Sequence, residues 1–167
     1  MADVIEAVPP AVDASGNLTV WWLDEADYAD LTALTAAELA DENRITYSFV
    51  PGGWAPTADQ AVDVDDRLTY PETLQAFGKI TTATPLRYVD SDDPGSAAVR
   101  LVAGSKGAFV ERRNVANGSE VAAGQKYRAF PRTLGIQVPE APPETGKFTI
   151  AQATISNGQI VNGTVAA

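Results

Sequence analysis

The stretch GAFVERRNVANGSEVAAGQKYRAFPRTLGIQV, from Gly107 to Val138, decides the fold class of this chain. Both of its ends contain β-branched and aromatic residues and a polar segment separates them, which predicts two strands joined by a loop. Leu134, Ile136 and Val138 alternate with small or polar residues, a pattern typical of a strand with one buried and one wet face. Pro131 has no backbone N–H, so we expect an edge or a bend there.

Further strands are predicted on both sides of this stretch. Upstream, they cover residues 17–23, 45–50 and 80–89, and Trp21 and Trp22 are expected to place one ring in the core and one outside. Downstream, Asn157-Gly158 suits a two-residue turn, which predicts a hairpin that sets Ile155 opposite Ile160.

Helix signals are few. Residues 93–104 are the best candidate, because Asp93 can cap the helix, Pro94 fits its first position and Gly104 can end it. Thr35 and Glu38 fit a capping box ahead of a turn or two. The sum is seven or eight strands and one helix. It predicts a mainly β fold, a sandwich or barrel of two antiparallel sheets with one short flanking α-helix.

The chain of 167 residues is expected to form one domain. Residues 1–16 hold Pro9-Pro10 and little to bury, so they are predicted to be an extended N-terminal arm, followed by a single β-sandwich domain at 17–167. Within that domain, residues 51–75 are rich in Pro, Gly, Asp and Thr. They are predicted to form a long loop, with a short strand possible around 62–70.

Composition narrows the chemistry. The chain has no cysteine and no histidine, which excludes thiol catalysis and disulfides and removes the commonest general base and metal ligand. The carboxylates at Asp63, Asp65 and Asp66 could bind a hard cation, but they lack the spacing of a calcium loop and are read as solvated acids. We therefore expect no enzyme activity, cofactor or metal. No apolar run or leader predicts a membrane segment.

Charge is distributed unevenly along the chain. The net charge is −10, yet residues 1–66 hold fourteen acids and one base, whereas residues 67–167 hold eight acids and eleven bases. The quoted stretch and its flank are the most basic part. Nucleic-acid binding is one interpretation, but an acidic chain repels polyanions at long range. The alternative is docking of this part on the acidic part of another copy, a contact between unlike surfaces that yields a ring or a filament.

A subunit interface is therefore predicted from residues of three kinds. They are an aromatic residue in a Pro/Gly-rich segment, the basic residues of the hairpin, and acids that follow the first strand. The predicted set is Trp54, Lys106, Arg112, Arg113, Lys126, Arg128, Arg132, Asp24, Glu25 and Asp27.

The order of segments resembles the tail tube protein, or major tail protein, of long-tailed bacteriophages. LTALTAAELADENRITYSFV at 31–50 is similar to the family's Thr-Ala-Glu-Leu turn running into a strand. AAVRLVAGSKGAFVERRNV at 97–115 is similar to its helix, glycine-rich turn and strand ending in Arg. AAGQKYRAFPRTLGIQVPEAPPETGKFTIAQATISNGQIV at 122–161 resembles its closing strands.

This resemblance implies a structural virion protein made in the bacterial host cytoplasm. Its copies would self-assemble into hexameric rings, and stacked rings would form the tail tube. The N-terminal arm and the 51–75 segment would reach adjacent subunits or rings. The resemblance further implies tape-measure, tail-tip and tail-terminator proteins as partners, and transient passage of double-stranded DNA at ejection. We expect carboxylates to dominate the wall of the conduit, because basic contacts would hold the DNA.

Two alternatives stay open from the sequence. A phage decoration protein or another β-sandwich binding module would explain the fold but not the arm and the 51–75 segment. A glycan hydrolase that works with two carboxylates would need a pair of acids at a set separation, which sequence spacing does not reveal.

Overall fold

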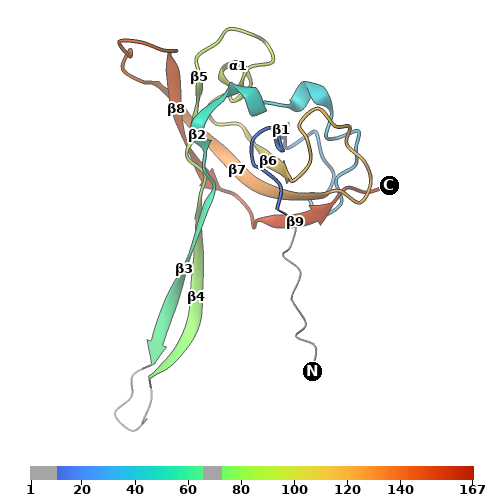
Figure 1. Ribbon diagram of the computed structural model, residues 1–167. Helices are drawn as coiled ribbons and strands as arrows, with labels where there is room; N and C mark the ends of the chain where they lie inside the picture. Colours follow the sequence, from blue (N-terminus) through green and yellow to red (C-terminus); the bar gives the residue numbers. More distant parts are fainter. Residues whose placement is uncertain (1–10, 66–72) are drawn as a thin grey trace, which may run out of the picture.

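The computed structural model describes residues 11–65 and 73–167, and its architecture is mainly β (Figure 1). Helical structure in these residues consists of two 3₁₀ turns, η1 (Asp41–Asn43) and η2 (Thr46–Ser48), and one α-helical turn, α1 (Ala97–Arg100). The strands found in these residues are β1 (Leu18–Asp24), β2 (Phe49–Trp54), β3 (Thr57–Asp65), β4 (Leu74–Ala83), β5 (Leu86–Val89), β6 (Lys106–Arg113), β7 (Lys126–Pro139), β8 (Thr149–Ser156) and β9 (Val161–Thr164).

The quoted stretch forms the centre of the larger sheet, as predicted. β6 and β7 pair antiparallel, with Phe109 opposite Phe130. The sheet order is β1-β6-β7-β8-β5-β2, with β9 beside the first half of β7. The sheet curls, so that β2 packs its Trp54 ring 5.2 Å from Phe109 and 5.6 Å from Phe130. The long strand β7 thus belongs to both layers, and the predicted two-layer β fold is confirmed.

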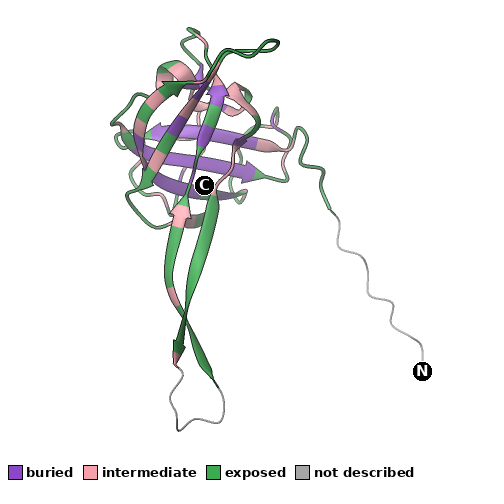
Figure 2. Cartoon of the chain, turned by 90° about the vertical axis from the view of Figure 1, so that its left-hand side faces the viewer, coloured by how far each residue is buried: buried purple, intermediate pink, exposed green. Residues whose placement is uncertain are grey.

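Two hydrophobic clusters lie on opposite faces of β1, β6 and the first half of β7. Trp22 belongs to the cluster between the layers, whereas Trp21 belongs to a second cluster under residues 31–39 and Val165. Both rings are fully buried. The prediction of one outer ring was wrong, because the segment after β1 folds back and covers the second face. In Figure 2 the purple, buried residues follow these central strands.

The chain after β8 does not form the predicted hairpin. β8 and β9 both pair with β7 and run in the same direction along its edge, with residues 157–160 between them. The interruption lies opposite Pro131, whose carbonyl accepts a bond from the Asn157 amide at 3.4 Å. A residue's N–H and C=O point to the same side of a strand, so the missing N–H of Pro131 faces this gap. β7 itself runs unbroken through Pro131, but the pairing along this edge is interrupted there, and Asn157-Gly158 lie in the gap.

The segment 51–75 contains strands rather than the predicted loop. β2 continues into β3, and β4 continues into β5, so that these four strands make one long two-stranded ribbon. Its far part, the β3–β4 hairpin, leaves the body, and its strands are largely exposed (Figures 1 and 2). The predicted single strand at 80–89 is divided at Thr84-Pro85, where the ribbon enters the body. The predicted strand at 45–50 begins later, because residues 46–48 form η2.

Of the predicted helix at 93–104, only the single turn α1 is helical. Asp93 does not cap it; the Asp93 carboxylate instead accepts the Gly95 amide at 2.8 Å, which makes a turn. Ser96 is the cap residue and accepts the Val99 amide at 3.4 Å. The capping box is confirmed, since Thr35 and Glu38 bond reciprocally, but it closes an isolated turn.

The predicted N-terminal arm lies largely outside the described residues. Residues 11–16 have no strand or helix and are exposed. The division into an arm at 1–16 and one domain at 17–167 stays a prediction.

Candidate assembly surfaces

The predicted interface residues separate into an acidic end, a basic end and a buried group. Asp24, the last residue of β1, and Glu25 and Asp27 in the turn after it are exposed, and the Glu25 amide donates to the carbonyl of Lys106 at 3.0 Å. We call these three residues the acidic turn. Lys106, the first residue of β6, is exposed beside them.

Three other basic residues gather at the opposite end of β6. Arg113, Lys126 and Arg128 are exposed and line one open pocket of about 600 Å³. We call these three residues the basic cluster. β1 and β6 pair over their whole length, with Asp24 opposite Gly107 and Leu18 opposite Arg113. The two charged surfaces are therefore separated by the length of β6, about 23 Å, and do not meet within one protomer.

A buried carboxylate organises the basic cluster. Glu111 is almost completely buried, and its Oε1 lies 2.9 Å from Nε of Arg113 and 3.8 Å from Nη1 of Arg128. Its Oε2 accepts a hydrogen bond from the indole of Trp54 at 2.8 Å. Glu111 thus pairs closely with Arg113 and more loosely with Arg128, whose Nε donates to Asn162 Oδ1 at 2.9 Å.

Two of the predicted contact residues are buried inside the protomer, which corrects their assignment. Arg112 stacks on the Trp21 ring at 5.3 Å and donates to Gln125 Oε1 and to the Ser119 carbonyl. Arg132 donates to Thr84 Oγ1 at 3.0 Å. Burial lowers the pKa of both arginines. Both faces of β6 and of this part of β7 are covered, so these side chains are buried on either face, and the paired basic residues of the sequence do not reveal this.

Trp54 is also placed differently from the prediction. It is the last residue of β2, not a loop residue, and it packs against Phe49, Phe109 and Phe130. Together with the contact of Arg132 to Thr84, the Trp54–Glu111 bond fixes the root of the β3–β4 hairpin to the body. These residues anchor the hairpin, and Trp54 is half-buried there.

The hairpin has two unlike faces, which the sequence analysis did not predict. Cross-strand partners share a face, and Val62 pairs with Phe77 and Gln60 with Ile80, whereas Asp63 pairs with Ala76 and Asp59 with Thr81. One face is therefore apolar and the other acidic. The alternation of Val62 and Val64 with Asp63 and Asp65 is the signal that could have identified this two-faced strand.

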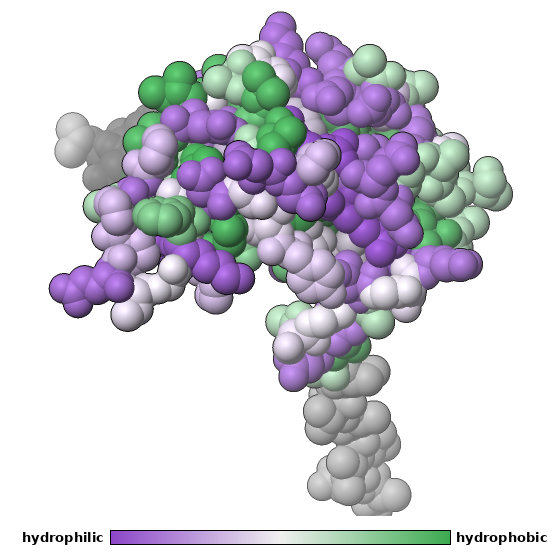
Figure 3. All heavy atoms as spheres, turned by 90° about the horizontal axis from the view of Figure 1, so that it is seen from above, coloured by the Kyte–Doolittle hydropathy of each residue, from purple (hydrophilic) through white to green (hydrophobic). Residues whose placement is uncertain are grey.

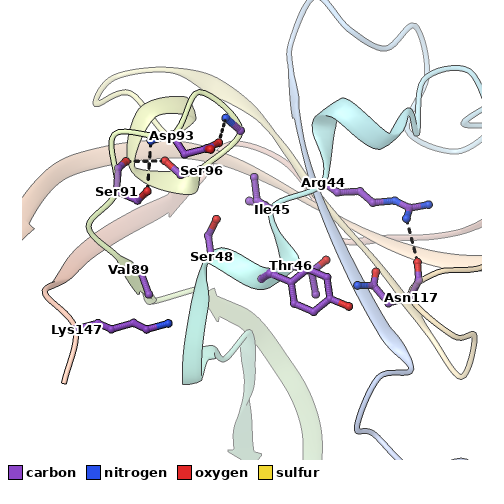
Figure 4. Close-up of a pocket in the computed structure, with 12 residues that line it drawn as sticks. Arg44, Ile45, Thr46, Ser48, Val89, Ser91, Asp93, Ser96, Asn117 and Lys147 are labelled. Atoms are coloured by element: carbon purple, nitrogen blue, oxygen red, sulfur yellow. Dashed lines mark hydrogen bonds between the residues drawn. The ribbon is translucent and has the colours of Figure 1, made fainter.

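A second open pocket, of about 360 Å³, lies at the α1 end of the molecule (Figure 4). It is formed by side chains from separate segments, among them Thr46 and Ser48 of η2, Ser96 at the start of α1, and Lys147. Tyr47 lines it and is 86% exposed. Figure 3 looks onto this end and shows hydrophobic patches among hydrophilic atoms.

Neither a membrane-spanning helix nor a metal-binding cluster is found in the described ranges, 11–65 and 73–167. No helix there is long and apolar enough to cross a membrane. No group of three or more Asp or Glu side chains in these ranges is arranged to hold a metal ion. The acidic stretch considered for a cation extends to Asp66, which lies outside them.

A protein-family comparison decides the relationship of the chain. The model of a family described as phage tail tube protein matches residues 6–167. The chain belongs to the phage tail tube protein family. No curated protein matches it.

Membership fixes the general role of this tail tube protein. It is a structural component of a phage tail and a subunit of a tube built from many copies. Its exposed charged ends and its projecting hairpin are therefore candidate contacts between copies.

Proposed function

We propose that this tail tube protein self-assembles into hexameric rings that stack into a hollow tube, through which double-stranded DNA leaves the virion. The observation that carries this proposal is the separation of the acidic turn and the basic cluster along β6. Unlike surfaces at two ends of one subunit make a heterologous contact, and such a contact closes into a ring when the rotation between copies permits it.

In each ring, the acidic turn of one copy contacts the basic cluster of the next. Glu111 holds Arg113 and Arg128 in place before the contact forms, so little side-chain freedom is lost. Lys126 adds a third cation at the rim of the same pocket. The contact is solvent-exposed, so it selects partner and orientation more than it supplies affinity.

The conduit is lined by more acids than bases. A protein that neutralises many phosphates binds DNA tightly through counterion release, whereas a passage must let it slide. The net charge of −10 supports an acidic wall. The described part of the hairpin adds Asp59, Asp63 and Asp65 against Lys79.

The remaining features follow from tube assembly. The arm at 1–16 and the β3–β4 hairpin reach adjacent subunits or rings. Tape-measure, tail-tip and tail-terminator proteins set the length and the two ends of the tube. The protein is made in the host cytoplasm, acts in the virion tail, and uses neither a cofactor nor catalysis.

Charge reversal tests the ring contact. Asp27→Lys and Arg128→Glu are each expected to abolish rings and tubes in negative-stain microscopy of concentrated protein. A mixture of the two variants should restore rings of alternating copies, because each contact between unlike variants has either the native or the doubly reversed pair of charges. Glu144→Lys, an exposed change away from both surfaces, is the control and should assemble normally. Normal tubes from both reversed variants would contradict the proposed contact, and compact particles from the unmodified protein under all conditions would contradict the proposed function.

A further inference from the structure

The chain contains three steps at which an asparagine precedes a glycine, Asn117-Gly118, Asn157-Gly158 and Asn162-Gly163. Such a step is prone to spontaneous deamidation, because no Cβ on the glycine hinders the approach of its amide nitrogen to the asparagine side chain. The reaction closes a five-membered ring. It needs an unbonded side-chain amide, an unbonded glycine N–H and an asparagine that can leave the extended conformation. The fold meets these requirements unequally at the three steps.

Asn117 is held on several sides. It is 7% exposed, and its Oδ1 accepts a hydrogen bond from the Thr19 hydroxyl at 2.9 Å. Its carbonyl accepts Nη1 of Arg44 at 3.0 Å, and its amide donates to the Gly16 carbonyl at 2.8 Å. Neither its side chain nor its backbone can rotate without breaking these bonds.

Asn162 is held by a strand. It lies in β9 opposite Arg128, and Gly163 lies opposite Tyr127. Nε of Arg128 donates to Oδ1 of Asn162 at 2.9 Å. An extended backbone keeps the side-chain carbonyl carbon away from the next amide nitrogen, so ring closure here requires β9 to separate from β7.

Asn157-Gly158 has neither constraint. Both residues are exposed and lie between β8 and β9, where the pairing along the edge of β7 is interrupted. The Asn157 amide donates to the Pro131 carbonyl at 3.4 Å, a long distance for such a bond. Ser156 Oγ donates to the Gly158 carbonyl at 2.8 Å, which leaves the nitrogen of Gly158 untouched. In the described part of the chain, no hydrogen bond involves the Asn157 side chain or the Gly158 N–H.

The packing of Gly158 favours glycine at this position. An added Cβ would lie 3.1 Å from Cβ of Pro131 and 3.2 Å from its Cγ. These contacts are tighter than ordinary van der Waals distances, so a larger residue would have to displace the proline ring. The fold thus favours the least hindered residue at the position whose nitrogen must attack.

We propose that Asn157 is a site of spontaneous deamidation in the folded protomer. The Gly158 nitrogen gives up its proton to solvent and attacks Cγ of Asn157. The new N–Cγ bond forms, the Cγ–Nδ2 bond breaks, and Nδ2 leaves as ammonia with a proton from solvent. One water molecule then opens the succinimide. Opening at Cγ gives an aspartyl residue, and opening at the backbone carbonyl gives an isoaspartyl residue.

The reaction takes place within one protomer, so it does not depend on the proposed tube. Both products carry one more negative charge than the original chain, because a carboxylate replaces a neutral amide. Ion-exchange chromatography therefore separates them from the unmodified protein. The isoaspartyl product also has one more methylene in its backbone between β8 and β9.

Ageing of the purified protein in mildly alkaline buffer tests the proposal. Peptide mapping by mass spectrometry measures conversion at each step, and an isoaspartyl methyltransferase labels the isoaspartyl product. Asn157 should convert about tenfold faster than Asn117 or Asn162, since hydrogen bonds worth about 1 kcal/mol each must first break at those two sites. In concentrated urea, where the fold is lost, the three steps should convert at similar rates.

Two variants assign the product. Asn157→Gln should not form the new acidic species, because its longer side chain closes a six-membered ring much more slowly. Asn162→Gln, a change at an exposed position of β9, should form it as the wild type does. An acidic species that persists in Asn157→Gln and is absent from Asn162→Gln would overturn the assignment.

The remaining outcomes are equally decisive. Faster conversion of Asn157 in buffer, with similar rates in urea, supports the proposal. Equal conversion of the three steps in the folded protein overturns it, as does an Asn157 that converts in urea but not in buffer. The same preference for Asn157 in urea as in buffer would assign the selectivity to neighbouring residues in the sequence and would also overturn it.

Discussion

The indole nitrogen of Trp54 donates a hydrogen bond to Oε2 of Glu111 at 2.8 Å, joining the end of β2 to a buried carboxylate on β6. The same carboxylate lies 2.9 Å from the guanidinium of the exposed Arg113. One buried group therefore holds both the root of the hairpin and a cation of the basic cluster. The β3–β4 hairpin and the basic cluster are therefore both held in place by Glu111.

Loss of this support should destabilise the protomer. Glu111→Gln removes the charge that pairs with two arginines and is expected to lower the free energy of unfolding by about 1–3 kcal/mol. Trp54→Phe keeps an aromatic ring but removes the donor, and is expected to lower it by about 1 kcal/mol. Urea unfolding measures both, with Glu120→Gln as an exposed control. Equal free energies of unfolding for Glu111→Gln and the wild type would show that the charge of this carboxylate does not stabilise the protomer.

Arg112 is predicted to be structural. It bridges the Trp21 ring and the carbonyls of residues 116–120, so Arg112→Met leaves buried acceptors unpaired. A loss of about 1–3 kcal/mol is expected. Lys126→Met, on the surface, should change stability by less than about 0.5 kcal/mol. Differential scanning calorimetry of the two variants checks this, and a larger loss for Lys126→Met would contradict the assignment.

Tyr88 should make the fold sensitive to alkali. Burial raises the pKa of its hydroxyl to about 12, from an ordinary value of 10.0. The folded state therefore keeps this proton between these values while the unfolded state releases it, so stability is full below pH 10 and falls as the pH rises toward 12. Two pKa units correspond to at most about 2.7 kcal/mol.

The measurement is the midpoint of urea unfolding at pH 8 to 11. Tyr88→Phe loses a hydrogen bond to Gln152 but should show a shallower alkaline decline than the wild type. Tyr47→Phe is the control, because Tyr47 is exposed. Parallel declines of wild type and Tyr88→Phe would assign the alkaline sensitivity to another group.

Gly107 permits the close approach of β1 and β6. A Cβ at this position would lie 2.1 Å from the Leu23 carbonyl oxygen and 2.8 Å from Cζ2 of Trp22. Gly107→Ala is therefore expected to cost about 1–3 kcal/mol or more through overpacking. Gly118→Ala has open space around it and serves as the control. Thermal unfolding by circular dichroism distinguishes them, and similar midpoints would contradict the tight packing at the β1–β6 contact.

The fold class could be read from local patterns. The apolar ends of the quoted stretch predicted the strands correctly. The predicted buried face of Leu134, Ile136 and Val138 was wrong, because only Leu134 is buried, whereas Ile136 is 73% and Val138 49% exposed. The register between β7 and β8 shifts after Leu134, which no local pattern shows. Pro131 marked the interruption correctly, because a missing N–H acts at its own position. The partner of β9 was not readable, since pairing depends on which edge is free after β7 and β8 have met.

The candidate surfaces were only partly predictable. The residues of the acidic turn and of the basic cluster are charged in any context, and the structure leaves them exposed. Arg112 and Arg132 carry the same charge but are buried. Arg112 stacks on the Trp21 ring, and Arg132 donates a hydrogen bond to Thr84. The hairpin was mistaken for a loop because Gly, Pro and Asp are common in both, and neither strand has an apolar face that the protomer itself buries.

The sequence by itself determined a β-rich chain with unlike charges in its two parts, because strand preference and formal charge belong to individual residues and their neighbours. Tertiary structure alone decided which arginines are buried, where the 51–75 segment runs, and that the charged surfaces stand at opposite ends of β6. These properties depend on contacts between residues far apart in the chain, such as Trp54 and Glu111, and no local pattern encodes them.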